Sequence, residues 1–144
     1  MEQQSKNRIP TKILVYFAGH FDGEGCITMR HRPNKGIQRL SISVTGNFKK
    51  TLEDYKHYFG GAVRSIPHSS KNKLLYEWYV GSFSDMYFFL SHLKPFLKEK
   101  REQANVALQY LKIRLRCRTN RNSLPRKISL LATETFTLLS QTKK

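Results

Sequence analysis

Acidic side chains are scarce in this chain, so the place where two of them occur together is informative. The sequence has 26 Lys and Arg residues against 10 Asp and Glu residues. Asp22 and Glu24 alternate with two glycines, directly after an apolar segment with helical spacing. Carboxylates and free backbone carbonyls are the oxygen ligands that Mg²⁺ prefers, and bound Mg²⁺ usually keeps waters and phosphate oxygens. The pattern fits a metal-dependent phosphodiester hydrolysis site. An ordinary turn without chemistry is the alternative.

The charge of the chain indicates a polyanionic partner. The formal net charge is +16 and the sequence pI is about 10.2. Apolar residues make up 39% of the 144 residues, which is enough to fold, so we expect one domain over 1–144 with a flexible start at 1–9. A folded domain this basic most commonly binds nucleic acid. The apolar runs are too short for a helical membrane span.

Cysteine usage and the polar start of the chain indicate the compartment. Cys26 and Cys117 form no CxxC pair or Cys/His cluster, which argues against a zinc site and a disulfide framework. The first residues lack the apolar core of a secretory signal. We therefore expect an intracellular protein with no targeting signal. In a eukaryotic host it would work in a chloroplast or mitochondrion, and otherwise in the cytoplasm.

The periodicity of apolar residues predicts an α+β domain with the element order αββαββα. Helical spacing predicts helices over 11–21, 51–59, 85–93 and 99–115, with a last helix over 126–139. Ser84 is the predicted N-cap of the third helix. Alternation predicts one hairpin from 26–32 and 38–45, and a second from 62–66 and 74–81. Hairpins separated by a helix, without long crossovers, predict a four-stranded antiparallel sheet.

Two strings in this sequence resemble the LAGLIDADG family of homing endonucleases. The first runs from Tyr16 to Ile27, where Phe17 stands for the leading Leu and Gly23-Glu24-Gly25 for the closing Ala/Gly-Asp-Gly. The second runs from Leu93 to Asn105 and resembles the segment that carries a basic active-site residue in this family. Their order and spacing extend the resemblance over most of the chain. The resemblance implies the family's fold, with a saddle-shaped sheet in each subunit.

The resemblance also implies roles for particular residues. Glu24 would be the metal ligand, on a longer arm than the Asp that is also common there, and the Gly23 carbonyl a second ligand. Lys100 would stabilise phosphate charge or polarise the attacking water, although it would otherwise be a solvated lysine opening a helix. Family members often carry Gln or Lys just after the second strand. Asn47 is the candidate at that point, with a basic group from Lys49 or Lys50 as the alternative. Asp22 is expected to support the helix end.

A single copy of the motif implies a homodimer of this chain. The first helices of two subunits would pack together and bring two Glu24 carboxylates to the base of the interface. The residues expected in that interface are Phe17, Ala18, Gly19, His20 and Phe21. The implied cofactor is Mg²⁺, with Mn²⁺ as an active substitute and Ca²⁺ supporting binding without cleavage.

The open face of the sheet is the expected DNA-reading surface, because a β-ribbon fits the major groove. The two hairpins offer base or phosphate contacts at Arg30, Arg32, Gln38, Arg39, Arg64, His68, Lys71, Asn72, Lys73, Tyr76 and Trp78. Arg116 and Arg118 would contact flanking phosphates. For each single residue, a solvated basic side chain is the alternative.

Two functions fit these expectations. The first is a group I intron homing endonuclease that cuts both strands of a long pseudo-palindromic site and leaves short 3′ overhangs. The second is a non-cleaving DNA- or RNA-binding protein on the same scaffold, such as an intron RNA maturase. Retention of both Glu24 and Lys100 favours the enzyme. No RRM or KH signature supports a generic RNA-binding domain.

Overall fold

The structure, a computed structural model, describes residues 8–32, 37–67, 74–116, 134–135 and 137–141. Its elements are α1 (Thr11–Glu24), β1 (Gly25–Arg32), β2 (Ile37–Gly46), α2 (Lys49–Phe59), β3 (Ala62–Ile66), β4 (Leu75–Tyr79), α3 (Phe83–Leu93), the short 3-10 helix η2 (Lys94–Phe96) and α4 (Arg101–Arg116). This order confirms the predicted αββαββα arrangement. Of the predicted helix over 126–139, residues 126–133 and 136 lie outside the described residues, while 134–135 and 137–141 are helical.

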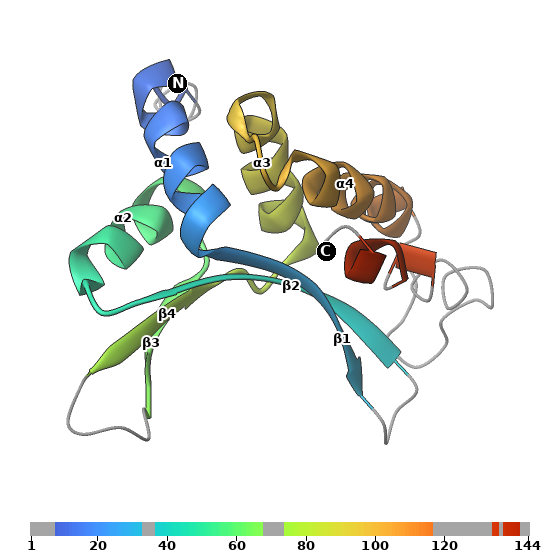
Figure 1. The fold of residues 1–144 in the computed structure, drawn as a ribbon, viewed down its shortest axis with the longest axis horizontal. Helices are drawn as coiled ribbons and strands as arrows, with labels where there is room; N and C mark the ends of the chain where they lie inside the picture. The colour runs from blue at the N-terminus through green and yellow to red at the C-terminus, as the bar shows by residue number, and fades with distance from the viewer. Residues whose placement is uncertain (1–7, 33–36, 68–73, 117–133, 136, 142–144) are drawn as a thin grey trace.

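The four strands form one antiparallel sheet in the order β1-β2-β4-β3. Each predicted hairpin is present, and β2 and β4 join the two hairpins at the centre. Figure 1 shows the sheet as an arch whose two hairpins bend away from the helices. All the labelled helices lie on the convex side, so none of the helices labelled in Figure 1 covers the concave, open face. This confirms the predicted α+β fold and its saddle-shaped sheet.

The core lies between the convex face of the sheet and the helices. Strand alternation sends Leu40, Ile42 and Val44 of β2 inward, and each is 1% exposed or less. The inner face of α1 buries Phe17 and Phe21 against an aromatic cluster from α2, β4 and α3. In that cluster the Phe17 and Tyr55 ring centroids are 4.6 Å apart, and those of Phe21 and Phe89 are 5.0 Å apart. Helix α1 is therefore fixed by packing of its inner face from Leu14 to Phe21.

Three helix starts differ from the sequence prediction by two residues, including that of α2 at Lys49, and the end of α1 differs by three. Helix α1 continues through Gly23 and ends at Glu24, not at Phe21. The next residue, Gly25, is extended, with φ −80° and ψ 164°. A Cβ at Gly25 would overlap the Phe21 ring, so only glycine fits there. Helix α3 starts at Phe83 because the Ser82 hydroxyl accepts a hydrogen bond from the Asp85 N–H, which makes Ser82 the N-cap in place of Ser84. Helix α4 starts two residues after the predicted position.

The start of the chain is partly described. Residues 1–7 of the segment expected to be flexible lie outside the described residues. Ile9 packs against the core, and the Pro10 carbonyl accepts hydrogen bonds from the N–H groups of Ile13 and Leu14. Within the described ranges, no helix has the length and apolar character needed to cross a membrane.

Candidate active site

The end of α1 is tied to the segment before α4 by three hydrogen bonds. The Asp22 carboxylate accepts from the backbone N–H of Lys98 at 2.8 Å and from that of Lys100 at 2.9 Å. In return, Lys100 Nζ donates to the Asp22 backbone carbonyl at 2.7 Å. Asp22 therefore supports the helix end. It also holds the Lys100 ammonium at its own backbone carbonyl, two positions before Glu24 in the sequence.

The Glu24 carboxylate is the unpaired acidic group of this site. Glu24 is exposed at the last position of α1, and among the described residues its carboxylate has no hydrogen bond or ion pair. Helix C-termini carry a partial negative charge, so a carboxylate there is disfavoured unless a cation compensates it. The arrangement leaves Glu24 available to a ligand from outside the chain.

The backbone carbonyls at the end of α1 complete the oxygen donors. The last carbonyls of a helix have no intrahelical donor. The Phe21 carbonyl accepts from the Gly25 N–H, and that of Asp22 accepts from Lys100 Nζ. The Gly23 carbonyl has no such partner within the part of the chain that the structure describes. A carboxylate and a free carbonyl side by side suit a hard divalent cation.

One chain supplies few acidic ligands to such a cation. Among the described residues, no group of three or more His, Cys, Asp or Glu side chains comes together. Mg²⁺ is commonly held by one or two carboxylates with waters and substrate phosphates filling the other positions. The donor set of Glu24 and Gly23 fits that mode of binding and does not fit a closed all-protein cage.

The sheet register brings the end of β2 to the same place. Gly25 pairs with Val44, so the residues that follow Val44 lie beside the end of α1. Asn47 follows two residues after Thr45 and is exposed. Lys49 and Lys50 begin α2, where each forms an i, i+4 ion pair, Lys49 with Glu53 at 3.8 Å and Lys50 with Asp54 at 3.5 Å. Asn47 is thus an exposed, uncharged polar side chain close in sequence to this corner of the sheet, while the two lysines have carboxylate partners on their own helix.

A buried tyrosine beneath the site was not found from the sequence. His20 Nδ1 lies 2.8 Å from the Tyr55 hydroxyl, and Tyr55 is fully buried in the core. Burial, followed by the neighbouring Tyr16 and the negative charge of Glu24, raises the pKa of Tyr55 far above its ordinary value. The Tyr55 hydroxyl stays protonated at neutral pH and fixes His20 one turn before Glu24. Tyr55 carries no signal in the sequence beyond the apolar periodicity of its helix.

Apart from Tyr76 and Trp78, the candidate DNA contacts fall into three groups. Arg39, Arg64 and Arg116 are exposed, and Arg39 Nη2 donates to the Gly81 carbonyl at 2.7 Å. The backbone of the first hairpin pairs Arg30 with Arg39, His31 with Gln38 and Arg32 with Ile37, but the side chains of Arg30, Arg32 and Gln38 lie outside the described set. The remaining predicted contacts also lie outside the described residues: His68, Lys71, Asn72, Lys73 and Arg118.

Two predicted contacts on β4 face the other way. Trp78 is 0% exposed, stacks on Tyr55 at 4.8 Å and donates from Nε1 to the Gly60 carbonyl at 2.8 Å. Tyr76 lies on the same side of the strand and packs against the core, with Lys49 Nζ 5.6 Å from its ring centroid. The prediction that Trp78 reads DNA is therefore wrong, and Tyr76 belongs to the helix-covered face. Alternation along β4 turns Glu77 and Tyr79 to the open face in their place.

The predicted interface on α1 is also corrected in part. Phe17, Ala18 and Phe21 are at most 2% exposed and face the chain's own core, so their side chains cannot form an outer surface. His20 is half-buried and Gly19 is exposed. Five consecutive helical residues span more than one face of a helix, because each residue is rotated by about 100° from the last.

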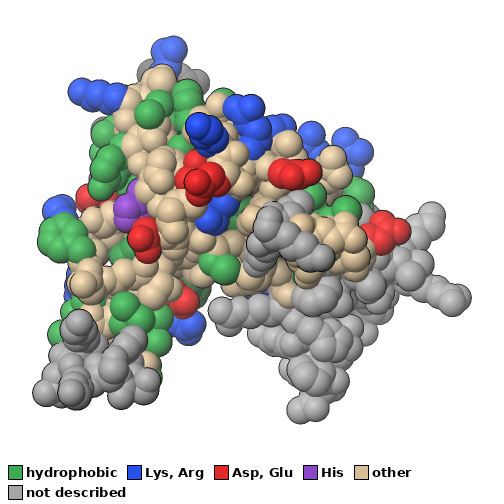
Figure 2. Space-filling view, in the orientation of Figure 1, with side chains coloured by type: hydrophobic (Ala, Val, Ile, Leu, Met, Phe, Trp, Pro, Cys, Tyr) green, Lys and Arg blue, Asp and Glu red, His purple; other side chains and the backbone are tan. Residues whose placement is uncertain are grey.

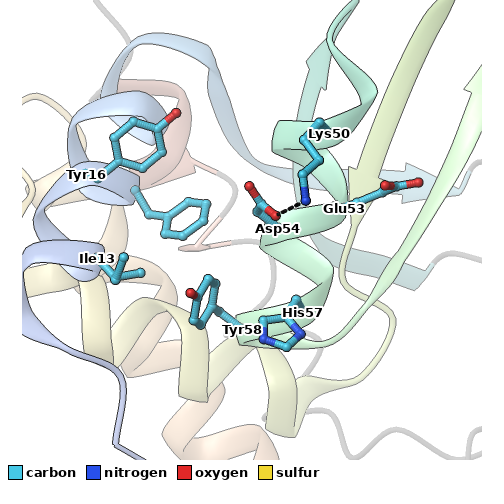
Figure 3. A pocket seen from close by; sticks show the side chains of 8 residues that line it. Ile13, Tyr16, Lys50, Glu53, Asp54, His57 and Tyr58 are labelled. Carbon is cyan, nitrogen blue, oxygen red and sulfur yellow. Dashed lines mark hydrogen bonds and ion pairs between the residues drawn. The ribbon is translucent and has the colours of Figure 1, made fainter.

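The outer face of α1 is apolar and flanked by a groove. Val15 is 49% and Tyr16 57% exposed. A Cβ built at Gly19 or Gly23 would meet nothing within 4 Å, so this flank is flat. A groove of about 490 Å³ lies between α1 and α2, and Figure 3 shows the side chains that line it. Its lining is Ile13, Tyr16, Phe17, Lys50, Glu53, Asp54, His57 and Tyr58.

The described surface is strongly basic away from this groove. Figure 2 shows Lys and Arg side chains along the outer side of the helix layer, with a few Asp and Glu side chains among them. The chain has a formal net charge of +16, so carboxylates are a minority of its charged side chains. A net charge of this size attracts a polyanion, which raises the rate of encounter.

Known proteins share this sequence pattern and this fold. The sequence profile described as LAGLIDADG endonuclease matches residues 17–114. The DNA endonuclease I-CreI of Chlamydomonas reinhardtii is 26% identical over 104 residues, which make up 69% of this chain and 63% of that protein. The match thus spans just under two thirds of that relative's length.

Solved structures of similar fold include short and long chains. The homing endonuclease I-CvuI, solved in complex with an I-CreI target in the presence of Mg, superposes with a TM-score of 0.59 at 21% identity, over 93% of this chain and 96% of that chain. The I-SmaMI LAGLIDADG homing endonuclease bound to cleaved DNA superposes with a TM-score of 0.66 at 17% identity, over 91% of this chain and 45% of that chain.

Proposed function

Because this chain belongs to the LAGLIDADG endonuclease family, we propose that it is a site-specific endonuclease that hydrolyses one phosphodiester bond in each strand of a DNA duplex. The observation that carries the proposal is the end of α1, where the unpaired Glu24 carboxylate follows two residues after the Asp22 carbonyl that holds the Lys100 ammonium. In a protein that only binds DNA, an unpaired carboxylate at this place would repel the phosphates. A hydrolase needs one to bind a divalent cation.

Glu24 and the Gly23 carbonyl would hold the divalent cation, and Mg²⁺ is the ion that this donor set favours. When bound, the cation supplies charge neutralisation at the phosphate and a lowered pKa for water. The Lys100 ammonium adds a second positive charge at the scissile phosphate, where it stabilises the charge that develops in the transition state. Asp22 holds that lysine in place and keeps its own carboxylate occupied with two backbone N–H groups. The Asn47 amide, at the adjoining end of β2, orients water at the site.

A homodimer completes the active unit. The chain covers nearly all of the short I-CvuI chain but less than half of the I-SmaMI chain, so it corresponds to one half of a larger LAGLIDADG unit. The apolar outer face of α1, with Gly19 and Gly23 open to close approach, is the surface on which a second copy packs. Two copies bring two Glu24 carboxylates together and provide one site for each strand.

The concave face of the sheet binds the duplex. Its curvature (Figure 1) and its exposed Arg39 and Arg64 suit the major groove, where each base pair presents a distinct pattern of donors and acceptors. A two-fold dimer reads a pseudo-palindromic site, because each subunit contacts one half. Cutting across the minor groove leaves short 3′ overhangs, and homing of a group I intron is the process that such cleavage serves.

Cleavage of a selected duplex tests the proposal. A DNA target site is first obtained by repeated selection of duplexes that bind the purified chain from a random pool in Ca²⁺. Cleavage of both labelled strands of that duplex is then followed in Mg²⁺. We expect a single cut in each strand at offset positions. A wild-type chain that binds its selected site and never cuts in Mg²⁺ or Mn²⁺ would support the non-cleaving binding protein in place of the enzyme.

A further inference from the structure

An ion pair lies on the open face of the sheet, where a carboxylate is out of place. Glu77 sits in the middle of β4, and it is 8% exposed. It pairs across the sheet with Thr45 on one side and Arg64 on the other. Because its neighbour Trp78 points into the core, Glu77 points to the concave face. A buried carboxylate on a surface that binds phosphates needs a reason, since Glu is almost never buried unless it is paired.

The partner of Glu77 is held in one orientation. Arg64 Nε donates to Glu77 Oε1 at 2.9 Å, and Arg64 Nη2 lies 2.6 Å from the same oxygen. The guanidinium carbon also lies 4.9 Å from the centroid of the Tyr79 ring, which is on the same face of β4. The carboxylate fixes one edge of the guanidinium and the ring supports its plane. The Arg64 side chain is nevertheless 56% exposed, so it is oriented without being covered.

The free edge of this guanidinium has the donors that read guanine. Arginine has five N–H donors, and Glu77 occupies one on Nε and one on Nη2. The end formed by Nη1 and the second hydrogen of Nη2 has no partner among the described residues. Two parallel donors of this kind match the O6 and N7 acceptors of guanine in the major groove, which is the commonest specific contact between protein and DNA.

We propose that Arg64 is a specificity-determining residue that selects guanine at one position in each half-site, and that Glu77 is the positioning residue that presents it. This inference rests on the proposed function, because it assumes that the concave face binds duplex DNA. Glu77 lowers the charge of the surface, so it does not serve general affinity. It reduces the number of orientations of the Arg64 side chain, and a guanidinium fixed before binding loses less entropy when it meets the base.

Selection on duplex DNA separates the two roles. Four proteins are each used to select from a random-sequence duplex pool in Ca²⁺: the wild-type full chain, Arg64→Lys, Glu77→Gln and the control Glu53→Gln. Affinities are then measured for the wild-type site and for every single-base substitution of it. Glu53→Gln is a matched control, because it also removes a carboxylate from an ion pair, but on α2. Thermal unfolding of each variant confirms that it is folded.

We expect the wild-type chain to require guanine at a symmetric pair of positions. Arg64→Lys keeps the charge but loses the fork of donors, so the preference for guanine there falls by about 5- to 150-fold. Glu77→Gln lowers the preference at the same positions, while its affinity for random duplex stays equal or becomes tighter because a negative charge is gone. Glu53→Gln leaves the preference unchanged.

Each of the other outcomes contradicts one stated part of the proposal. If Glu77→Gln loses thermal stability but keeps the full guanine preference, the ion pair is only a cross-strand contact and the positioning role is wrong. If Arg64→Lys keeps the preference, Arg64 does not read the base. A wild-type chain that enriches no sequence contradicts specific DNA recognition itself, and with it the proposed function. Failure of that function is therefore visible before any variant is compared.

Discussion

Asp22 and Lys100 hold each other through both backbone and side chain. The Asp22 carboxylate accepts the Lys100 N–H at 2.9 Å, and Lys100 Nζ donates to the Asp22 carbonyl at 2.7 Å, across 78 residues of sequence. This reciprocal pair joins the end of α1, which carries Glu24, to the start of α4. The basic group of the proposed site is therefore positioned by an acidic residue that would itself bind no metal.

Asp22→Asn is expected to slow cleavage more than it weakens binding. An amide can accept only one of the two N–H groups that the carboxylate accepts, so the segment that carries Lys100 shifts. A misplacement of about 1 Å at a reacting group can cost about 100-fold in rate. Single-turnover rates and duplex affinities measure the two effects separately. The matched control is Asp54→Asn, whose carboxylate pairs with Lys50 away from Lys100. A folded Asp22→Asn chain that cuts at the wild-type rate would refute the positioning role.

Gly19→Leu is expected to block dimerisation and leave the fold intact. A Cβ at Gly19 meets nothing within 4 Å in the single chain, and replacing a mid-helix glycine favours the helix by up to about 1 kcal/mol. A leucine on this face would hold two α1 helices apart. Sedimentation velocity should show a dimer for the wild-type chain and a folded monomer for the variant. If the variant is still a dimer, the two copies pack through another surface.

The free energy of unfolding is expected to fall as the pH rises above about 10. Burial raises the pKa of Tyr55 in the folded chain, while the unfolded chain keeps the ordinary value of 10.0. Above that pH the unfolded state releases the proton and the folded state retains it, so stability decreases by up to about 1.4 kcal/mol per pH unit for this group. Urea denaturation over an alkaline pH series measures the slope. Tyr55→Phe should have a shallower slope than the wild-type chain, and equal slopes would show that the Tyr55 hydroxyl already ionises near its ordinary pKa.

Trp78→Phe is expected to affect stability and not DNA recognition. The variant loses the hydrogen bond from Nε1 to the Gly60 carbonyl and part of the packing against Tyr55. A lost hydrogen bond and a partly filled core together cost on the order of 2 kcal/mol. Urea denaturation should show the loss, while the base preferences of the folded variant match those of the wild-type chain. A changed base preference would place the Trp78 side chain at the DNA after all.

The elements could be predicted because their signals are local. Leu40, Ile42 and Val44 alternate along β2, and α1 repeats its apolar residues at helical spacing. The motif likewise lies within one segment, so Glu24 was identified from its neighbours alone. The end of α1 was misjudged because glycines at a helix end indicate a stop, yet Gly25 alone breaks the helix.

The contacts of the site depend on pairings that the sequence does not display. Without the strand register, Arg64, Tyr76 and Trp78 were equal candidates, although a shift of one residue moves a side chain to the opposite face. The same gap hid Glu77, whose partner is known only from the pairing of β3 with β4. No local signal connects Asp22 with Lys100 either, so the contacts of the Asp22 carboxylate are known only from the structure.

Glu24→Gln tests the central claim most directly. Glutamine keeps the size of the side chain and removes the charge that would hold a divalent cation. On the selected duplex in Mg²⁺, we predict that the wild-type chain cuts both strands while the variant binds with similar affinity and cuts at least about 100-fold more slowly. A folded Glu24→Gln chain that cuts at the wild-type rate would show that the carboxylate at the end of α1 is not part of the hydrolytic site.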